Sequence, residues 1–214
     1  MLVYNLTHHF DVLCLSFNDI FNFKIYAVEY FELHEDFDFN EWTLEHDIAI
    51  IKLKRKVNLQ RPEVNVVCVP QYESTYKVKS GENAVAIGWG SYAEDFNHTA
   101  YVRDHLQQAV FTIRDQNDQI CNTGMIGNKW NKNFTMCAGG KKKVTCFGDS
   151  GGPVLAYRKD RWYLIGIISF AHDIKEENSN KKKCNASMPF YFVKVKAYYE
   201  WINQKTEYIL GSFQ

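Results

Sequence analysis

Eight consecutive residues constrain this chain more than any others: Cys146-Phe147-Gly148-Asp149-Ser150-Gly151-Gly152-Pro153. A serine with glycines close on both sides lies where side-chain bulk has been removed, so a reactant can approach its hydroxyl. The backbone N–H groups of Gly148 and Ser150 can point into the same space and stabilise an oxyanion. Asp149 adds a carboxylate, and Cys146 can fix the loop covalently. The stretch therefore predicts a loop built for nucleophilic serine chemistry.

Length and charge limit the classes of function. With 214 residues, the chain can bury a substantial core as one domain or as two small ones. Lysine plus arginine equals aspartate plus glutamate at 25 each, so the net charge is zero and nothing favours nucleic acid or an anionic membrane. No apolar run approaches the roughly 20 residues of a membrane span. We predict neither a nucleic-acid nor a membrane partner.

Six cysteines without Cys-x-x-Cys spacing favour disulfides over zinc. The glycine string fails the phosphate-binding pattern because a lysine follows Gly140-Lys141, so we predict no metal and no cofactor. Four Asn-x-Ser/Thr sequons favour a glycosylated, secreted protein. The start shows no signal peptide, so we expect a chain that is incomplete at its start. The sequons begin at Asn5, Asn97, Asn133 and Asn185.

Alternating apolar and polar residues predict a mostly β protein, either a sandwich or a barrel. Residues 1–30 show this alternation, and a polar, glycine-free stretch at Thr112–Cys121 predicts a short helix. A second helix is expected at Lys196–Leu210. The clearest strands are expected at Asp47–Leu53, Asn83–Gly88, Gln107–Ile113, Pro153–Tyr157, Trp162–Ser169 and Phe190–Lys194.

The eight-residue stretch resembles the nucleophile loop of the chymotrypsin/trypsin family of serine endopeptidases, and the resemblance extends from about Phe31 to about Ile202. Gly88-Trp89-Gly90, Met136-Cys137-Ala138-Gly139 and Tyr199-Glu200-Trp201-Ile202 resemble further family segments. The family implies two packed six-stranded β-barrels with the active site between them. We expect an incomplete first barrel with its connector at 1–72, a second barrel at 73–195, and a C-terminal helix and tail at 196–214.

The resemblance also assigns roles. Ser150 is the nucleophile, Asp47 orients the base, and Ser169 supports Asp47, while Gly148 and Ser150 supply the oxyanion donors. Asp149 would pair with an amine freed by cleavage of an Ile-Val-Gly-Gly type site, and the chain contains no such sequence.

The base is not identified by a motif, because the chain has no Thr-Ala-Ala-His-Cys type string. His46 is expected on a strand with its side chain opposite that of Asp47. His9 remains as a candidate, although a better alignment places Val3–His9 just after a catalytic histidine that would lie upstream of Met1. His8, beside His9, is also not excluded, whereas the other histidines resemble no catalytic position: His34, His98, His105 and His172.

The specificity pocket is expected to be apolar. Val144 takes the place of the aspartate that selects basic substrates, and Phe170, Ala171 and Phe190 fall on the walls. The pocket then admits a small apolar residue or is blocked. The family also implies the disulfides Cys121–Cys137 and Cys146–Cys184. Cys68 resembles the cysteine that binds an upstream segment, and here it is either free or paired with Cys14.

Three hypotheses follow. The chain is part of a secreted serine endopeptidase that is nearly inert without its base, a secreted pseudoprotease that acts as a binding module, or an enzyme that uses His9. Its partner is correspondingly a polypeptide substrate or a regulatory protein.

Overall fold

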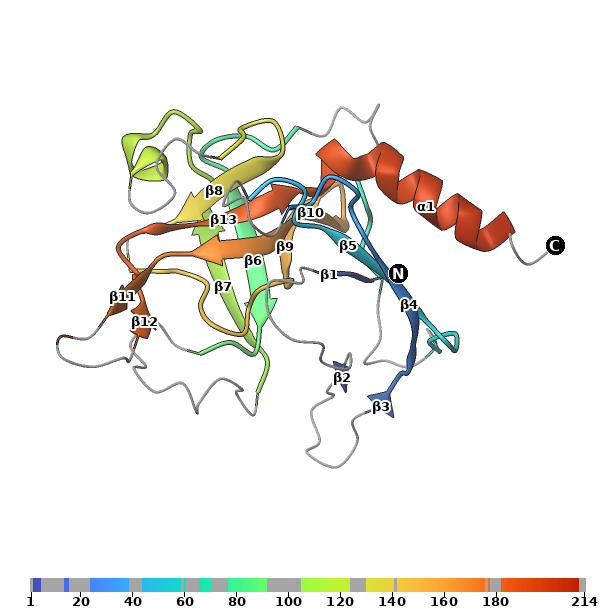
Figure 1. Cartoon of the computed structure of the whole chain (residues 1–214). Helices are drawn as coiled ribbons and strands as arrows, with labels where there is room; N and C mark the ends of the chain where they lie inside the picture. The colour runs from blue at the N-terminus through green and yellow to red at the C-terminus, as the bar shows by residue number, and fades with distance from the viewer. Residues whose placement is uncertain are drawn as a thin grey trace.

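The computed structural model is composed mainly of β-strands and ends in one α-helix (Figure 1), which confirms the predicted all-β fold class. It describes residues 2–4, 14–15, 24–38, 44–58, 60, 66–70, 77–91, 105–123, 130–140, 142–175, 177 and 182–211.

A six-stranded antiparallel sheet dominates the described residues. Its strand order is β7-β6-β9-β10-β13-β8. The two outer strands meet through a bridge between Ile113 and Ala138 and through a 3.0 Å hydrogen bond from the Arg114 N–H to the Cys137 carbonyl oxygen. The sheet therefore curls until its edges touch. Its strands are β6 (Asn83–Gly88), β7 (Gln107–Thr112), β8 (Thr135–Gly139), β9 (Pro153–Arg158), β10 (Arg161–Ala171) and β13 (Pro189–Lys194).

The N-terminal part contributes two small sheets. The first has the order β1-β5-β4 and contains β1 (Leu2–Tyr4), β4 (Val28–Leu33) and β5 (Ala49–Leu53). The second pairs β2 (Cys14–Leu15) with β3 (Lys24–Ile25). A further two-stranded sheet, β11 (Asp173–Lys175) with β12 (Lys182–Cys184), extends from the end of β10.

The chain closes with a 3₁₀ turn, η2 (Val195–Tyr198), that leads directly into the helix α1 (Tyr199–Gly211). Tyr198 and Ile202 are buried in a cluster with Ile48, just before β5, and with residues of β10 and β13. Figure 1 shows α1 beside the three-stranded sheet, where the Trp201 indole N–H donates to Glu35 at 2.7 Å. The helix therefore holds the N-terminal sheet against the larger one.

Most predicted strands appear within one or two residues of their expected limits. Asn83–Gly88 is β6, and Gln107–Ile113, Pro153–Tyr157, Trp162–Ser169 and Phe190–Lys194 correspond to β7, β9, β10 and β13. The predicted C-terminal helix is also present. The strand expected from Asp47 begins only at Ala49, because a turn occupies Glu45 and His46.

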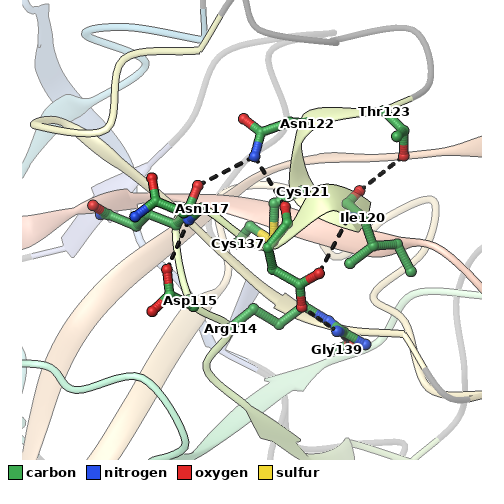
Figure 2. Close-up of polar contacts among 11 residues, drawn as sticks. Arg114, Asp115, Asn117, Ile120, Cys121, Asn122, Thr123, Cys137 and Gly139 are labelled. Carbon is green, nitrogen blue, oxygen red and sulfur yellow. Dashed lines mark hydrogen bonds and ion pairs between the residues drawn. A yellow bond between two sulfur atoms is a disulfide. The ribbon is translucent and has the colours of Figure 1, made fainter.

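The helix predicted at Thr112–Cys121 is wrong. Thr112 instead continues β7, and only the 3₁₀ turn η1 (Gln119–Asn122) forms. Figure 2 shows why: short polar side chains bond to nearby backbone groups, as when Asp115 accepts the N–H of Asn117 at 2.8 Å. Asp118 similarly caps η1 by accepting the Ile120 N–H. Such local bonds favour turns over helix.

Candidate active site

A buried aspartate and a buried serine form the first half of the site. Asp47 lies two residues before β5 and is 3% exposed, and Ser169 on β10 is 5% exposed. The Ser169 hydroxyl donates to Asp47 Oδ2 at 2.6 Å. Ser169 occupies a bulge, because Ile168 and Phe170 face consecutive residues of β13 and leave Ser169 unmatched. Bulges of this kind redirect one side chain, and here that side chain faces Asp47.

The glycine-rich loop forms the second half. Ser150 is exposed, and the loop is tied to β10 because the Gly151 N–H donates to the Ile168 carbonyl oxygen at 2.8 Å. Gly148 has a φ of 92°, which favours glycine. Among the described residues, neither the Gly148 nor the Ser150 N–H is used in a hydrogen bond. The loop thus presents an accessible hydroxyl next to backbone donors, at the strand that also carries Ser169.

The carboxylate of Asp149 is buried in the protein. It accepts the backbone N–H of Gly90 and that of Cys146, both at 2.9 Å. Burial raises the pKa of Asp149, although these two hydrogen bonds oppose the shift. None of the ion pairs among the described residues includes Asp149. Within the part that the structure describes, backbone donors alone hold this charge.

Two glycines make room for that carboxylate. A Cβ on Gly88 would lie 2.2 Å from Asp149 Oδ1, and one on Gly90 would lie 2.5 Å from the same atom. The Gly88-Trp89-Gly90 segment was recognised in the sequence only as a family resemblance. Its structural function, which is to receive Asp149, was missed because the two segments are far apart in the chain.

Both implied disulfides are present. Cys121 is bonded to Cys137, and Cys146 is bonded to Cys184. The second bond fixes the start of the nucleophile loop, which the Ser91 N–H also anchors by donating to the Phe147 carbonyl oxygen at 2.9 Å. Cys68 is free and half-buried, and the side chain of Cys14 lies outside the described residues.

The described histidines contact residues other than Ser150. His34 and His46 stack on each other at 4.5 Å, and the His46 N–H donates to the Tyr198 hydroxyl. His172 is buried beside Tyr191, and burial lowers its pKa. His105 is exposed. The remaining histidines, His8, His9 and His98, lie outside the described residues, so the candidate base His9 is not placed.

The predicted pocket residues pack closely. Phe190 is fully buried, with its ring 4.8 Å from that of Phe111. Val144 and Ala171 pack against the same apolar cluster. Phe170 lies apart from these three, with its ring against those of His172 and Tyr191. Thr145, next to Val144, was not predicted as a site residue, and its buried hydroxyl has no hydrogen-bond partner among the described residues.

Together, the curled β-sheet, the glycine-flanked serine and the buried aspartate define a protein of the serine peptidase class. The model of the trypsin family matches residues 22–202. The chain belongs to the trypsin family of serine peptidases.

Curated relatives agree with this assignment. The chain is 30% identical over 179 residues to CLIP domain-containing serine protease B4 of Anopheles gambiae, an alignment that covers 82% of this chain and 45% of that protein. It is also 30% identical over 175 residues to transmembrane protease serine 7 of Homo sapiens, covering 78% of this chain and 18% of that protein. The chain thus spans less than half the length of these relatives. Among the described residues, no helix is long and apolar enough to cross a membrane.

Proposed function

We propose that this domain performs acyl transfer through Ser150, as a serine endopeptidase does. The observation that carries the proposal is the 2.6 Å hydrogen bond from Ser169 to Asp47. The residue before Ser169, Ile168, anchors the nucleophile loop through its carbonyl oxygen. Strand β10 therefore links the orienting carboxylate to the loop of the nucleophile. Gly148 and Ser150 supply the oxyanion donors in this proposal.

We expect slow turnover from the 214-residue chain. Its sequence has no histidine in the family motif, and the described histidines are engaged elsewhere. Loss of the base in a triad lowers turnover by about 10⁶, or roughly 8 kcal/mol of barrier. His9 is the remaining candidate within this chain.

A fluorophosphonate probe tests the nucleophile directly. The probe should label the folded protein, and Ser150→Ala should abolish labelling while the exposed-serine variant Ser80→Ala keeps it. If His9→Ala also removes labelling, His9 is the base; if it leaves slow labelling unchanged, Ser150 reacts without it. No labelling of correctly folded protein overturns the proposal.

A binding module is the second candidate, and the burial of Phe190 favours it. Phe190 is 0% exposed and belongs to the cluster against which Val144 and Ala171 pack, so aromatic bulk fills the expected specificity pocket. Phe190→Gly would then open the pocket. In a working enzyme, this variant should gain hydrolysis of peptides with large apolar residues, whereas a binding module should gain none.

We also propose an extracellular location and the domain limits 1–72, 73–195 and 196–214. Two disulfides support the location, as does the exposed sequon residue Asn133. Cys68 is free to pair with another segment or chain. Expression through a secretory pathway should give a product whose mobility changes on treatment with an N-glycosidase, and an unchanged mobility would remove the glycosylation proposal.

A further inference from the structure

Three side chains with metal-binding chemistry converge at one end of the β4–β5 sheet. His34 directly follows β4, Asp36 lies in the same turn, and His46 lies in the turn that leads to β5. One possible ligand atom from each residue lies within 4.8 Å of the other two. Two segments that are separate in the sequence therefore bring two imidazoles and a carboxylate together.

The backbone on both sides of this cluster is fixed. The His34 N–H donates to the Ile48 carbonyl oxygen at 3.1 Å, and the His46 N–H donates to the Tyr198 hydroxyl at 3.0 Å. His46 has a left-handed φ of 57°, which is uncommon for residues other than glycine. Asp47, the residue after His46, accepts a hydrogen bond from Ser169. The carboxylate of Asp47 therefore has a different neighbour from the imidazole of His46.

Aromatic rings enclose the two imidazoles. The rings of His34 and His46 stack with an interplanar angle of 24°, Trp201 lies 5.0 Å from His34, and Phe134 lies 4.9 Å from His46.

We propose that His34, Asp36 and His46 bind a divalent transition-metal ion of the zinc type. Two imidazole nitrogens and one carboxylate oxygen form a ligand set that zinc accepts, whereas calcium and magnesium prefer oxygen ligands throughout. Tetrahedral zinc with bonds of about 2.0–2.1 Å places its ligand atoms roughly 3.3 Å apart. The 4.8 Å limit requires an inward movement of the exposed Asp36 side chain, and one of the two stacked imidazoles must also rotate, because the lone pairs of stacked rings do not point at one ion.

A neighbouring hydroxyl can hold the ring of His46. The Tyr198 hydroxyl lies 3.3 Å from His46 Nδ1, which leaves Nε2 for the ion. Glu45 Oε2 lies 3.9 Å from that Nε2 and accepts a hydrogen bond from the Asn131 amide. Metal-bound histidines commonly have such oxygen partners. Three protein ligands leave a coordination position for water.

The test is calorimetric titration of the whole chain with zinc chloride. A Cys14→Ser/Cys68→Ser background removes both cysteines that are not part of the two disulfides, and binding should then show one saturable site. Asp36→Asn should raise the dissociation constant for zinc at least about 10-fold, and His34→Asn and His46→Asn should raise it about 100-fold. Asparagine suits position 46 because it tolerates a left-handed φ. His105→Asn, which changes an exposed histidine elsewhere, should bind zinc like the parent.

A spectroscopic measurement covers the case in which a variant misfolds. Substoichiometric cobalt added to the parent protein should selectively broaden the ring signals of His34 and His46 in the NMR spectrum. The proposal is overturned if the parent shows no saturable zinc binding, or if any of the three ligand variants binds zinc as tightly as the parent. It is equally overturned if cobalt broadens His105 as strongly as His34. The site does not involve Ser150, so the result is independent of the proposed acyl transfer.

Discussion

Two backbone N–H groups hold the carboxylate of Asp149 inside the protein, and no cation among the described residues pairs with it. Burying a charge without an opposite charge is costly, and the raised pKa of Asp149 reflects that cost. The missing side chains of Gly88 and Gly90 provide the space. The stability of the folded protein therefore depends on the protonation state of a residue next to the proposed nucleophile.

This dependence predicts how stability changes with pH. Because the folded-state pKa of Asp149 is raised above its unfolded value, the folded state binds the proton more tightly. Its contribution to stability is complete below the unfolded pKa and is lost as the pH rises through the folded pKa. The unfolding free energy of the wild type, relative to Asp149→Asn, should fall as the pH rises above 3.8, the ordinary pKa of an aspartate.

Urea unfolding at several pH values measures this difference. Asp160→Asn, a change of an exposed aspartate in the turn between β9 and β10, is the matched control and should show no such trend. A difference that is constant or that rises with pH would contradict the assigned direction of the Asp149 shift.

Single residues show where sequence reasoning was limited. The Cys146–Pro153 motif located the serine loop, and its glycines have local roles that a sequence can show. The surroundings of Asp149 could not be derived, because Gly90 is distant in the chain. The structure assigns His46 to a turn with positive φ, and alternation alone does not predict such a turn.

Strand β10 is the element on which the proposed site depends most. It pairs with β9 on one side and with β13 on the other, and its residues 164–169 are all buried. Gly166 lies where the ring of Phe192 crosses the strand, and a Cβ at this position would be 2.1 Å from Phe192 Cδ2. Phe192 is fully buried, so the ring has little space to move.

Gly166→Ala should therefore destabilise the fold by about 1–3 kcal/mol through overpacking. Phe192→Leu should reduce this penalty, so the double variant should lose less stability than the two single variants together. Urea denaturation of all four proteins provides the measurement. Additive losses would show that the ring of Phe192 does not cause the clash.

Strands were predicted well where apolar or β-branched residues lie next to a glycine or proline in the sequence. The β6 and β13 segments combine apolar or β-branched residues with nearby glycine or proline, and both formed as strands. The Thr112–Cys121 segment failed because its aspartates and asparagines bond locally, as the contacts of Asp115 and Asp118 show. Absence of glycine was not enough to predict a helix.

At the scale of the whole molecule, two disulfides stabilise the larger sheet and the loops attached to it. Cys121–Cys137 closes a separation of 16 residues, and Cys146–Cys184 closes one of 38. The chain-entropy model assigns more stabilisation to the longer loop. The longer one also fixes the start of the loop that carries Ser150.

Replacing both cysteines of a disulfide with alanine should lower the free energy of unfolding, and the loss should be larger for the disulfide that closes the longer loop. We expect a loss of roughly 4 kcal/mol for Cys146→Ala/Cys184→Ala and roughly 3 kcal/mol for Cys121→Ala/Cys137→Ala. Guanidinium unfolding without reductant measures both losses. A larger loss for the shorter loop would show that local packing, rather than loop length, decides the contribution.

Because Ser169 lies in a bulge, the contacts of the proposed site depend on the number of residues in β10 as well as on their types. One residue of this strand, Ile168, accepts a hydrogen bond from the serine loop, and the next one, Ser169, reaches Asp47. Removing a single residue between Gly166 and Ser169 would move the following side chains to the opposite face of the sheet, so Ser169 would no longer face Asp47. The strand should accordingly tolerate exchanges among aliphatic residues over evolutionary time, while insertions and deletions within it are eliminated.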